Sequence, residues 1–499
     1  MAESQPRVRA PEFPAGLEWL NTGRPLKIAE LRGKIIAVDF WTYCCINCMH
    51  ILPDLKKLEQ KYPDELVVIG VHSAKFDGEK QTENIRQAVL RYDIEHPVVN
   101  DLNMQVWSQW GVHAWPTVFL LDPEGKVSGY TSGEGIFEPF DRAIQQLIHE
   151  FDAKGLIDRK PLHLPLERDK QSRQPLSFPG KVIADPELNR LFIADSSHNR
   201  IVVAGLDGNV QEVIGSGKKG LSDGAFEAAS FDNPQGMALD CSLLYVADTD
   251  NHALRKVDLA NRTVETIAGN GKQASIHNQG GPGKEIELNS PWDLVIHQNR
   301  LYIAMAGPHQ LWQMNLTDGA LRPHAGSGRE GLVDGPLRSA ALAQPSGLAT
   351  DGAKLFFVDS EVSAVRSADF SSDGRVETVV GLDLFEFGDR DGVGPAVRLQ
   401  HPLGITWKAP FLLVADTYNN KIKQVDPAMR RCTTLLGSGE EGFQDGDSPR
   451  FDEPGGLCVA GDRLFIADTN NHAIRVADLE SKSVSTLQLK PVERLKPRE

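Results

Sequence analysis

Cysteine is scarce in this sequence: 6 of its 499 residues are Cys, too few for a fold held together by disulfides. Long apolar runs are missing as well, because no stretch approaches the roughly 18 consecutive apolar residues of a membrane-spanning helix. The opening Met1–Ala10 lacks the apolar core of a signal peptide. We therefore expect a cytoplasmic chain with no membrane partner. In a reducing compartment, a pair of nearby cysteines is better suited to redox cycling than to structural cross-linking.

Positive charge is also in short supply. Lys and Arg number 53 against 68 Asp and Glu, which gives a formal net charge of -15. An excess of negative charge repels phosphate backbones and anionic membrane surfaces. We therefore expect no nucleic-acid partner. A chain of 499 residues that is 40% hydrophobic has enough apolar material for about two to four globular domains.

Three of the six cysteines, Cys44, Cys45 and Cys48, fall within five positions. The apolar run Lys34–Phe40 before them predicts a buried strand, and the apolar spacing in Cys48–Tyr62 predicts a helix. Cys45 and Cys48 therefore stand where a strand turns into a helix. The unpaired N–H groups and the dipole of a helix start favour the thiolate over the thiol. The Cys-x-x-Cys spacing then lets the second thiol attack a mixed disulfide made by the first.

The sequence around these cysteines resembles the active-site block of thioredoxin-fold oxidoreductases. The matching residues are Val38-Asp39-Phe40-Trp41, Cys45-Ile46-Asn47-Cys48 and Pro53, with Trp115-Pro116-Thr117 similar to the family's cis-proline turn. The resemblance implies that Cys45 is the nucleophile, Cys48 the resolving thiol and Asp39 the buried carboxylate that handles the proton of Cys48. It also implies that Pro116 faces the dithiol. We expect Trp41 and Trp115 to face the substrate.

Cys44 departs from that pattern, because the family usually has Trp or another large residue before the nucleophile. We treat Cys44 as a candidate auxiliary thiol. Two alternatives to a redox dithiol remain open. A structural zinc site needs four ligands, and His50 is the only other candidate near the cysteines, so we predict no metal site. The second alternative is an inherited dithiol that has lost its activity.

Residues 11–151 are predicted to form one thioredoxin-like α/β domain. Strand and helix patterns alternate in it, with Glu65–His72 as a second buried strand and 137–151 as the closing helix. The extra helical segment Lys80–Tyr92 resembles the peroxiredoxin-like and TlpA-like branch of the fold. Residues 152–177 are rich in charged residues and Pro and lack sustained periodicity, which indicates a linker.

The rest of the chain repeats. A short apolar strand recurs six times at intervals of 52 to 57 residues, and its copies end at Asp195, Asp248, Met305, Asp359, Asp416 and Asp468. Four short strands per copy at this period predict six blades of a β-propeller over residues 178–489. Asp468-Thr-Asn-Asn-His472 and its counterparts resemble the NHL repeat. The predicted fold class is therefore multidomain α/β plus all-β, a thioredoxin-like fold followed by a six-bladed NHL-type propeller, with a charged tail at 490–499.

The repeated Asp residues suit tight turns at the strand ends, so we predict a structural role for them. Gly-rich acidic loops recur between the blades at 215–224, 326–335 and 437–446. They lack the ligand spacing of an EF-hand or of RTX calcium repeats, and Asp-Gly turns account for them. Loops of this kind on one face of a propeller suit the capture of a protein or peptide.

The third copy breaks the pattern. Met305 replaces the repeated Asp, Trp312 replaces an Arg of other copies, and Trp292-Asp293 replaces the x-Gly of a recurring Pro-x-Gly turn. Amphipathic aromatic side chains anchor interfaces, so Trp292, Met305, His309 and Trp312 are a candidate binding patch. The alternative is that the two Trp residues fill the space left by the lost polar network.

The order of a thioredoxin-like domain with Cys-Cys-Ile-Asn-Cys followed by six NHL-type blades closely resembles the NHL repeat-containing protein 2 family. Two functions follow. In one, the chain is a thiol–disulfide oxidoreductase with no cofactor beyond its redox-active disulfide; its propeller selects protein clients, and an upstream thiol reductant is a further expected partner. In the other, the chain is an interaction scaffold with a vestigial dithiol. A third alternative, a metal-dependent propeller hydrolase, needs a ring of inward ligands, whereas the repeated Asp residues recur as structural residues do.

Overall fold

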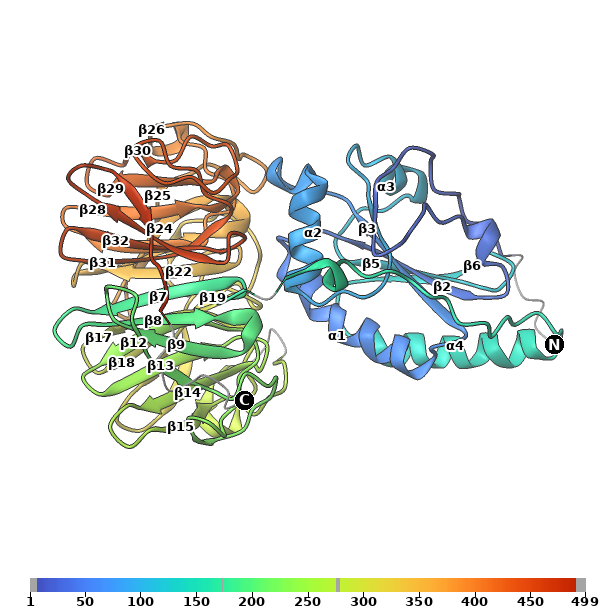
Figure 1. The fold of residues 1–499 in the computed structure, drawn as a ribbon, viewed down its shortest axis with the longest axis horizontal. Helices are drawn as coiled ribbons and strands as arrows, with labels where there is room; N and C mark the ends of the chain where they lie inside the picture. Colours follow the sequence, from blue (N-terminus) through green and yellow to red (C-terminus); the bar gives the residue numbers. More distant parts are fainter. Residues whose placement is uncertain (1–6, 173, 275–278, 491–499) are drawn as a thin grey trace. The chain divides into compact units, whose positions relative to one another are not determined.

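A computed structural model describes residues 7–172, 174–274 and 279–490 of the chain. The chain divides into two compact units, Met1–Arg173 and Gln174–Glu499 (Figure 1). No helix within the described residues is long and apolar enough to cross a membrane. The predicted charged tail lies outside the described residues except for Lys490.

The first unit is built on a six-stranded sheet with the order β1-β4-β3-β2-β5-β6. The central strand β2 is parallel to β3 and antiparallel to β5. The strands are β1 (Trp19–Leu20), β2 (Ile35–Trp41), β3 (Leu66–His72), β4 (Val98–Asn100), β5 (Thr117–Leu121) and β6 (Val127–Ser132). The helices are α1 (Ile46–Lys61), α2 (Thr82–Arg91), α3 (Gln105–Trp110) and α4 (Phe137–Asp152), with short 3-10 turns η1 (Ile28–Leu31), η2 (Gly78–Lys80) and η3 (Glu167–Lys170).

The side chains of β2 alternate between the two faces of the sheet, and both faces are buried. Ile35 and Ala37 join the core that α1 and α4 cover, and these two helices lie side by side in Figure 1. Val38 and Phe40 join the opposite core, which includes residues of α3. By this alternation Asp39 belongs to the face that α1 covers. The carboxylate is thus set beneath the helix that begins with the dithiol.

The chain after α4 stays with the first unit over much of the predicted linker. The Lys34 ammonium donates hydrogen bonds to the carbonyl oxygens of Asp158 and Lys160, at 2.7 and 2.6 Å. The Glu167 N–H donates to the Asn21 side chain at 2.8 Å, and Glu167 itself is buried. The division between the two units falls at residues 173 and 174.

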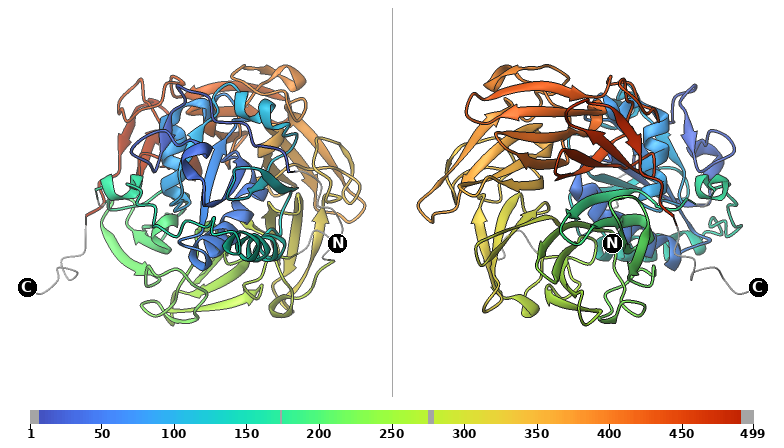
Figure 2. Two further views of the ribbon diagram at one scale, coloured as in Figure 1. Left: turned by 90° about the vertical axis from the view of Figure 1, so that its right-hand side faces the viewer. Right: turned by 60° about the vertical axis from the view of Figure 1, so that its left-hand side comes forward.

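The described residues of the second unit form six antiparallel sheets arranged in a ring (Figure 2). Blades 1 and 2 contain β7 (Pro179–Asp185), β8 (Arg190–Asp195), β9 (Arg200–Ala204), β10 (Val210–Ile214), β12 (Pro234–Asp240), β13 (Leu243–Asp248), β14 (Ala253–Asp258) and β15 (Thr263–Ala268). Blades 3 and 4 contain β17 (Pro291–His297), β18 (Arg300–Met305), β19 (Gln310–Asn315), β20 (Ala320–Ala325), β22 (Pro345–Thr350), β23 (Lys354–Asp359), β24 (Ala364–Asp369) and β25 (Arg375–Val380). Blades 5 and 6 contain β27 (Gly404–Lys408), β28 (Phe411–Asp416), β29 (Lys421–Asp426), β30 (Arg431–Leu436), β31 (Pro454–Ala460), β32 (Arg463–Asp468), β33 (Ala473–Asp478) and β34 (Val484–Thr486).

Short turns connect these strands. They are η4 (Ser196–His198), η5 (Gly283–Glu285), η6 (Ser360–Val362), η7 (Gly394–Ala396) and η8 (Thr417–Asn419). The fold is therefore the predicted thioredoxin-like α/β unit followed by a six-bladed β-propeller.

The ring closes through an edge strand. In blades 2 to 5 a two-residue strand from the preceding loop pairs with the outermost long strand; these are β11 (Gly224–Ala225), β16 (Gly281–Pro282), β21 (Gly335–Pro336) and β26 (Gly392–Val393). In blade 1 the same kind of position is taken by Lys490, from the end of the described chain. Its N–H donates to Gly208 O at 2.9 Å, and its carbonyl accepts from Val210 N at 3.0 Å. The end of the propeller sequence is thus held on its first blade.

The repeated Asp residues are structural, as predicted. Asp248 accepts the backbone N–H of Asp232 at 2.8 Å and pairs with the buried Arg255 at 2.8 Å. The pairs Asp359–Arg366 and Asp468–Arg475 repeat the ion pair in blades 4 and 6. Each Arg also contacts an Asp of the preceding Gly-rich loop, namely Asp223, Asp334 or Asp445. The acidic residues of these loops therefore neutralise a buried guanidinium.

Candidate functional site

The dithiol stands at the start of α1. Cys45 is the N-cap residue of this helix, and its carbonyl accepts the N–H groups of Cys48 and Met49 at 3.0 and 3.2 Å. Cys45 is partly exposed, whereas Cys48 lies one turn into the helix and is fully buried. Both are thiols in the structure. A partly exposed sulfur at a helix start is the arrangement that makes a thiol reactive.

Cys48 lies next to two groups that disfavour its ionisation. Burial raises its pKa well above the ordinary value, and a hydrogen bond with Cys45 and the negative charges of Cys45 and Asp39 act in the same direction. Cys48 is thus a protonated thiol at neutral pH. It needs a base before it can attack a disulfide.

Asp39 is a carboxylate close enough to Cys48 to act as this base. It is fully buried, and neither carboxylate oxygen has a hydrogen-bond partner within the described residues. Burial raises the pKa of Asp39 to about 7, and the charge of His96 opposes that shift. A carboxylate that titrates near neutral pH can both accept and return a proton.

Cys44 faces the interior. It is fully buried, its N–H donates to Glu79 Oε1 at 2.8 Å, and its sulfur lies 3.8 Å from Thr42 Oγ1. Cys44 therefore points into the interior, whereas Cys45, the next residue, remains partly exposed. Cys44 is accordingly poorly situated to act as an auxiliary thiol toward a client.

Glu79 is a site residue that the sequence patterns do not reveal. Its buried carboxylate accepts hydrogen bonds from Thr42 Oγ1 and Cys44 N, both at 2.8 Å, and from the backbone N–H groups of Lys75 and Phe76 at 3.0 and 2.9 Å. It thereby ties the cysteine loop to the chain segment that follows β3. A charged residue within a short turn gives no sequence signal for this role.

His72 supports the same loop from β3. Its Nε2 accepts the Tyr43 N–H at 3.3 Å, and its ring stacks on the Tyr43 ring with 5.4 Å between the centroids. Burial lowers the pKa of His72 to about 3, so the imidazole is neutral and able to accept. Two buried side chains from one region of the unit thus fix the backbone of the residues just before Cys45.

The Trp115–Pro116 peptide bond is cis, as the sequence resemblance implies. Pro116 immediately precedes β5, and Thr117 of β5 is paired with Phe40 near the end of β2. The cis-proline turn therefore lies beside the strand end from which the cysteine loop leaves. Trp115 is partly buried, with its indole N–H donating to Ser73 O at 3.0 Å and its ring centroid 4.6 Å from that of Trp107.

Trp41 is placed differently from the prediction. Its side chain is 1% exposed, and its ring lies edge-on to His72 with 5.1 Å between the centroids. Trp41 is the last residue of β2, so alternation directs it to the face covered by α1 and into the interior. The prediction that Trp41 faces the substrate is therefore wrong.

The predicted patch of the third blade is also wrong as an exposed surface. Trp292, Met305, His309 and Trp312 are 7%, 1%, 8% and 3% exposed. Met305 and Trp312 belong to one apolar core cluster, and His309 Nδ1 accepts the Gln344 N–H at 3.0 Å. Met305 and Trp312 stand where blades 2, 4 and 6 have the buried Asp–Arg pair. An apolar pair has therefore replaced an ion pair, which is the space-filling alternative raised by the sequence.

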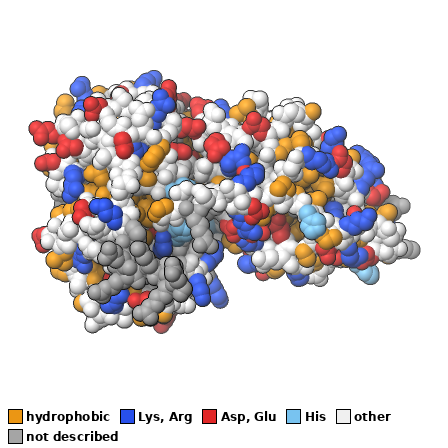
Figure 3. All heavy atoms as spheres, viewed as in Figure 1, with side chains coloured by type: hydrophobic (Ala, Val, Ile, Leu, Met, Phe, Trp, Pro, Cys, Tyr) orange, Lys and Arg blue, Asp and Glu red, His pale blue; other side chains and the backbone are white. Residues whose placement is uncertain are grey.

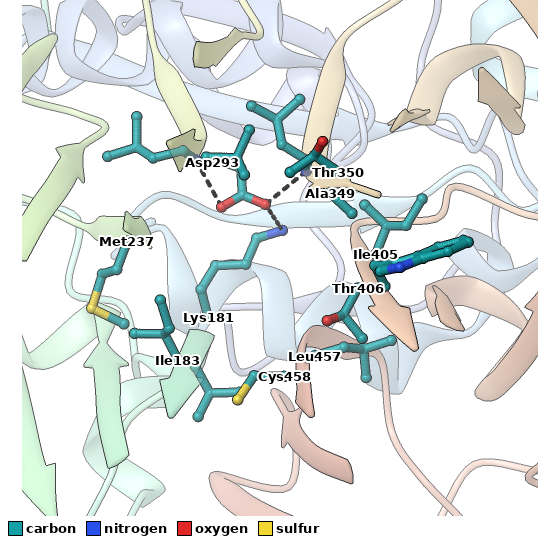
Figure 4. A pocket seen from close by; sticks show the side chains of 15 residues that line it. Lys181, Ile183, Met237, Asp293, Ala349, Thr350, Ile405, Thr406, Leu457 and Cys458 are labelled. Carbon is teal, nitrogen blue, oxygen red and sulfur yellow. Dashed lines mark hydrogen bonds and ion pairs between the residues drawn. The ribbon is translucent and has the colours of Figure 1, made fainter. Parts of the chain in front are cut away.

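The axis of the propeller holds a cavity of about 290 Å³ that the sequence patterns did not identify (Figure 4). Its walls are mostly apolar, with Met237, Ile405 and Leu457 among the lining residues. Lys181 of β7 reaches across it to Asp293 of β17. Both charged side chains are buried, and burial lowers the pKa of Lys181 and raises that of Asp293 while their attraction opposes both shifts.

Two further features are the distribution of surface charge and the grouping of side chains that could ligate a metal. On the face drawn in Figure 3, basic and acidic side chains are interspersed. Within residues 7–172, 174–274 and 279–490, no group of three or more His, Cys, Asp or Glu side chains is arranged to hold a metal ion.

Comparison with known proteins agrees with this architecture. A family model described as thioredoxin-like matches residues 33–127, and an NHL repeat model matches residues 451–477. NHL repeat-containing protein 2 of Bos taurus is 45% identical over 514 residues, covering 95% of this chain and 71% of the bovine protein. Protein SUPPRESSOR OF QUENCHING 1, chloroplastic, of Arabidopsis thaliana is also 45% identical, over 99% of this chain and 49% of the plant protein.

A third relative covers the first unit alone. Thiol-disulfide oxidoreductase ResA of Bacillus cereus is 27% identical over 125 residues, which is 25% of this chain and 70% of the bacterial protein. The fold and the comparisons define a thioredoxin-like domain related to thiol–disulfide oxidoreductases and joined to an NHL propeller. The chain belongs to the NHL repeat-containing protein 2 family. It spans about half the length of the plant relative and 71% of the bovine one.

Proposed function

We propose that this chain is a thiol–disulfide oxidoreductase whose propeller is a protein-binding platform that selects clients. One observation carries the proposal: a partly exposed Cys45 caps α1 and is hydrogen-bonded to a buried Cys48, which lies beside the buried Asp39. An accessible nucleophile, an inaccessible resolving thiol and a base near neutrality are the three parts that disulfide exchange needs. The relation to thiol–disulfide oxidoreductases supports the proposal.

The reaction uses only these groups. Cys45 Sγ attacks one sulfur of a client disulfide, so that a Cys45–client bond forms and the other client sulfur leaves as a thiolate. Cys48 gives its proton to Asp39 and attacks Cys45 Sγ, which forms the Cys45–Cys48 disulfide and releases the second client sulfur. The client gains two electrons and the dithiol loses two. Pro116, at the cis peptide beside the loop, presents backbone to the client chain in this scheme.

The proposal also covers the cofactor, the reductant, the compartment and the class of partner. The dithiol itself is the redox group, so we propose no further cofactor and no metal. An upstream thiol reductant returns the disulfide to the dithiol. A reducing compartment such as the cytoplasm keeps such a cycle running. The partner class is protein, engaged through the propeller loops, and neither nucleic acid nor a membrane takes part.

One observation favours the alternative of an interaction scaffold with a vestigial dithiol. Burial raises the pKa of Cys48 well above its ordinary value, so resolution needs a neighbouring base. If Asp39 did not take the proton, the mixed disulfide on Cys45 would persist and the chain would hold its partner covalently.

A redox titration of the full chain tests the proposal. The protein is equilibrated in glutathione buffers of graded potential, and the Cys45–Cys48 disulfide is quantified by alkylation and mass spectrometry. We expect a single two-electron transition, in which a tenfold change in the equilibrium constant corresponds to about 30 mV. The Cys48→Ser variant, as the matched control, should show no such transition. A pair that stays reduced over the whole range would favour the scaffold.

A further inference from the structure

Asp39 has no direct route to solvent for a proton that it accepts. The residue is fully buried, and neither oxygen has a hydrogen-bond partner in the described part of the chain. Its strand neighbours are Gly70 on β3 and Val118 on β5. Val118 is apolar and buried, so that side of Asp39 offers no group to receive a proton. The side toward Gly70 is different.

The space that a side chain at Gly70 would take is filled by Trp41, Val98 and His96, and two of these residues place a nitrogen atom there. A Cβ added at Gly70 would lie 2.9 Å from Trp41 Nε1 and 3.4 Å from His96 Nε2. Paired residues of neighbouring strands point to the same face, so the Asp39 side chain lies on the same face as these side chains. Trp41 Nε1 and both His96 nitrogens also have no hydrogen-bond partner among the described residues. Buried polar groups clustered without partners are uncommon and call for an explanation.

His96 connects this interior cluster to the surface. Its side chain is 4% exposed, and its Nδ1 lies 3.4 Å from Glu59 Oε1 on α1. The Glu59 side chain is 27% exposed. An imidazole can accept a proton on one nitrogen while it releases one from the other. His96 thus acts electrostatically on the buried Asp39 and lies within 3.4 Å of a solvent-accessible carboxylate.

The other charged groups around His96 are already engaged at the surface. Glu95, its neighbour in the chain, pairs with Lys56 of α1 at 3.2 Å and with Arg168 at 2.8 Å. Asp93 pairs with the same two cations. Of the carboxylates described around His96, Glu59 is the one at ion-pair distance from the ring.

We propose that His96 relays the proton of Cys48 from Asp39 to Glu59 and so to solvent. The inference rests on the proposed function and adds a residue to it. Cys48 loses its proton to Asp39 and attacks Cys45 Sγ. Asp39 and His96 are not hydrogen-bonded to one another in the structure, so the next transfer needs a side-chain movement that brings them together. Asp39 then gives that proton to His96, and His96 releases one from Nδ1 toward Glu59. The attack forms the Cys45–Cys48 bond and breaks the Cys45–client bond; the other bonds that change are N–H, O–H and S–H bonds. His96 acts through Asp39 and contacts neither thiol.

Single-turnover kinetics on the reduced full chain test the relay. An aromatic disulfide such as 5,5′-dithiobis(2-nitrobenzoate) releases one thiolate when Cys45 attacks and a second when Cys48 resolves the mixed disulfide. The experiment uses a Cys241→Ser background, because Cys241 is exposed. We expect His96→Gln to leave the first phase unchanged and to slow the second by about tenfold or more at pH 7, with a larger solvent isotope effect. Gly70→Ala, whose methyl group would displace Trp41 and His96, should slow the same phase.

The rate of the second phase in a double variant distinguishes a relay from a structural effect. In an Asp39→Asn background, His96→Gln should cause no further slowing, because a relay that receives no proton has nothing to transfer. His149→Gln, an exposed His on α4, is the control and should match the parent chain. An unchanged second phase in His96→Gln, equal slowing of both phases, or full additivity with Asp39→Asn would overturn the relay alone. A parent chain without any first phase would overturn the proposed function and the relay with it.

Discussion

Lys181 and Asp293 form an ion pair across the axis of the propeller, with 3.3 Å between Nζ and Oδ2. Both occupy the third position of the recurring Pro-x-Gly turn, where the other four blades carry Gly236, Gly347, Gly404 and Gly456. A Cβ at Gly236 would lie 2.3 Å from the Asp293 Cα, and one at Gly456 would lie 2.6 Å from the Lys181 Cα. Gly236 and Gly456 thus make room for the anion and the cation at the centre.

Removing either charge alone should destabilise the propeller. Lys181 also donates to Ser346 O at 2.9 Å and to Leu403 O, and Asp293 also accepts the N–H groups of Leu294 and Leu348. Asp293→Asn leaves a buried ammonium without its counter-charge, so we expect the free energy of unfolding to fall by about 3–5 kcal/mol. The double variant Lys181→Met/Asp293→Asn should lose less than the sum of the single variants. Urea unfolding of the four proteins measures this coupling, and strictly additive losses would contradict it.

The third blade gives a second prediction. Trp312→Arg introduces a guanidinium where Met305 stands in place of the Asp of blades 2, 4 and 6, and we expect a loss of about 3–5 kcal/mol in the free energy of unfolding. Adding Met305→Asp should restore part of it by rebuilding the pair seen in Asp248–Arg255. Recovery should remain partial, because Arg255 also has Asp223 as a partner. Thermal unfolding of both variants checks the order, and a Trp312→Arg protein as stable as the parent would contradict the assignment of Trp312 to the core.

The buried carboxylate predicts a pH dependence of stability. Burial raises the pKa of Asp39 to about 7 in the folded chain, against about 3.9 in an unfolded one. The folded state therefore holds this proton more tightly, so the contribution of Asp39 is fully favourable below pH 4 and is lost as the pH rises to 7. We expect Asp39→Asn to stabilise the first unit at pH 7.5 by up to about 4 kcal/mol and to have little effect near pH 4.

Hydrogen exchange of the β2 amides at the two pH values measures this difference within the full chain. If the Asp39→Asn protein and the parent are equally stable at pH 7.5, ionisation of Asp39 does not lower the free energy of unfolding, which would contradict this prediction. The same substitution slows disulfide resolution in the proposed mechanism, so stability and activity should change in opposite directions.

Glu79→Gln tests the clamp on the cysteine loop. A Gln side chain keeps one acceptor oxygen and places an NH₂ group against N–H or O–H donors, so about two of the four hydrogen bonds described above lose their acceptor. Each lost acceptor costs about 1–3 kcal/mol. We expect Cys44 to become accessible to alkylation several-fold faster than in the parent chain. Mass spectrometry after timed alkylation reads this directly, with the exposed Glu83→Gln as the control; unchanged protection of Cys44 would show that other contacts hold the loop.

Much of the fold and of the dithiol could be predicted because the signals are local. A few consecutive residues specify each of three features: the turn from β2 into α1 at Cys45, the cis bond at Pro116, and the strand ends at Asp248 or Asp468. The regular spacing of the repeated strand segments predicted the six blades.

The missed features depend on residues far apart in the sequence. Glu79 reaches Cys44 across 35 positions, and Lys181 reaches Asp293 across 112. The proposed role of His96 depends on Gly70 of β3, because the lack of a side chain there leaves room for the imidazole. Trp41 and the third blade were misjudged for a related reason: an aromatic residue on a strand has the same local pattern whether it faces a partner or a core.

The site of covalent attachment on the chain tests the central claim most directly. In a Cys48→Ser variant the mixed disulfide cannot be resolved, so a peptide disulfide added to the reduced full chain should remain attached. Proteolysis and mass spectrometry then locate it. We predict one adduct per chain, on Cys45 at the start of α1, formed faster than any adduct on the exposed Cys241. Attachment to Cys44, or no attachment before Cys241 reacts, would contradict the assignment of Cys45 as the nucleophile.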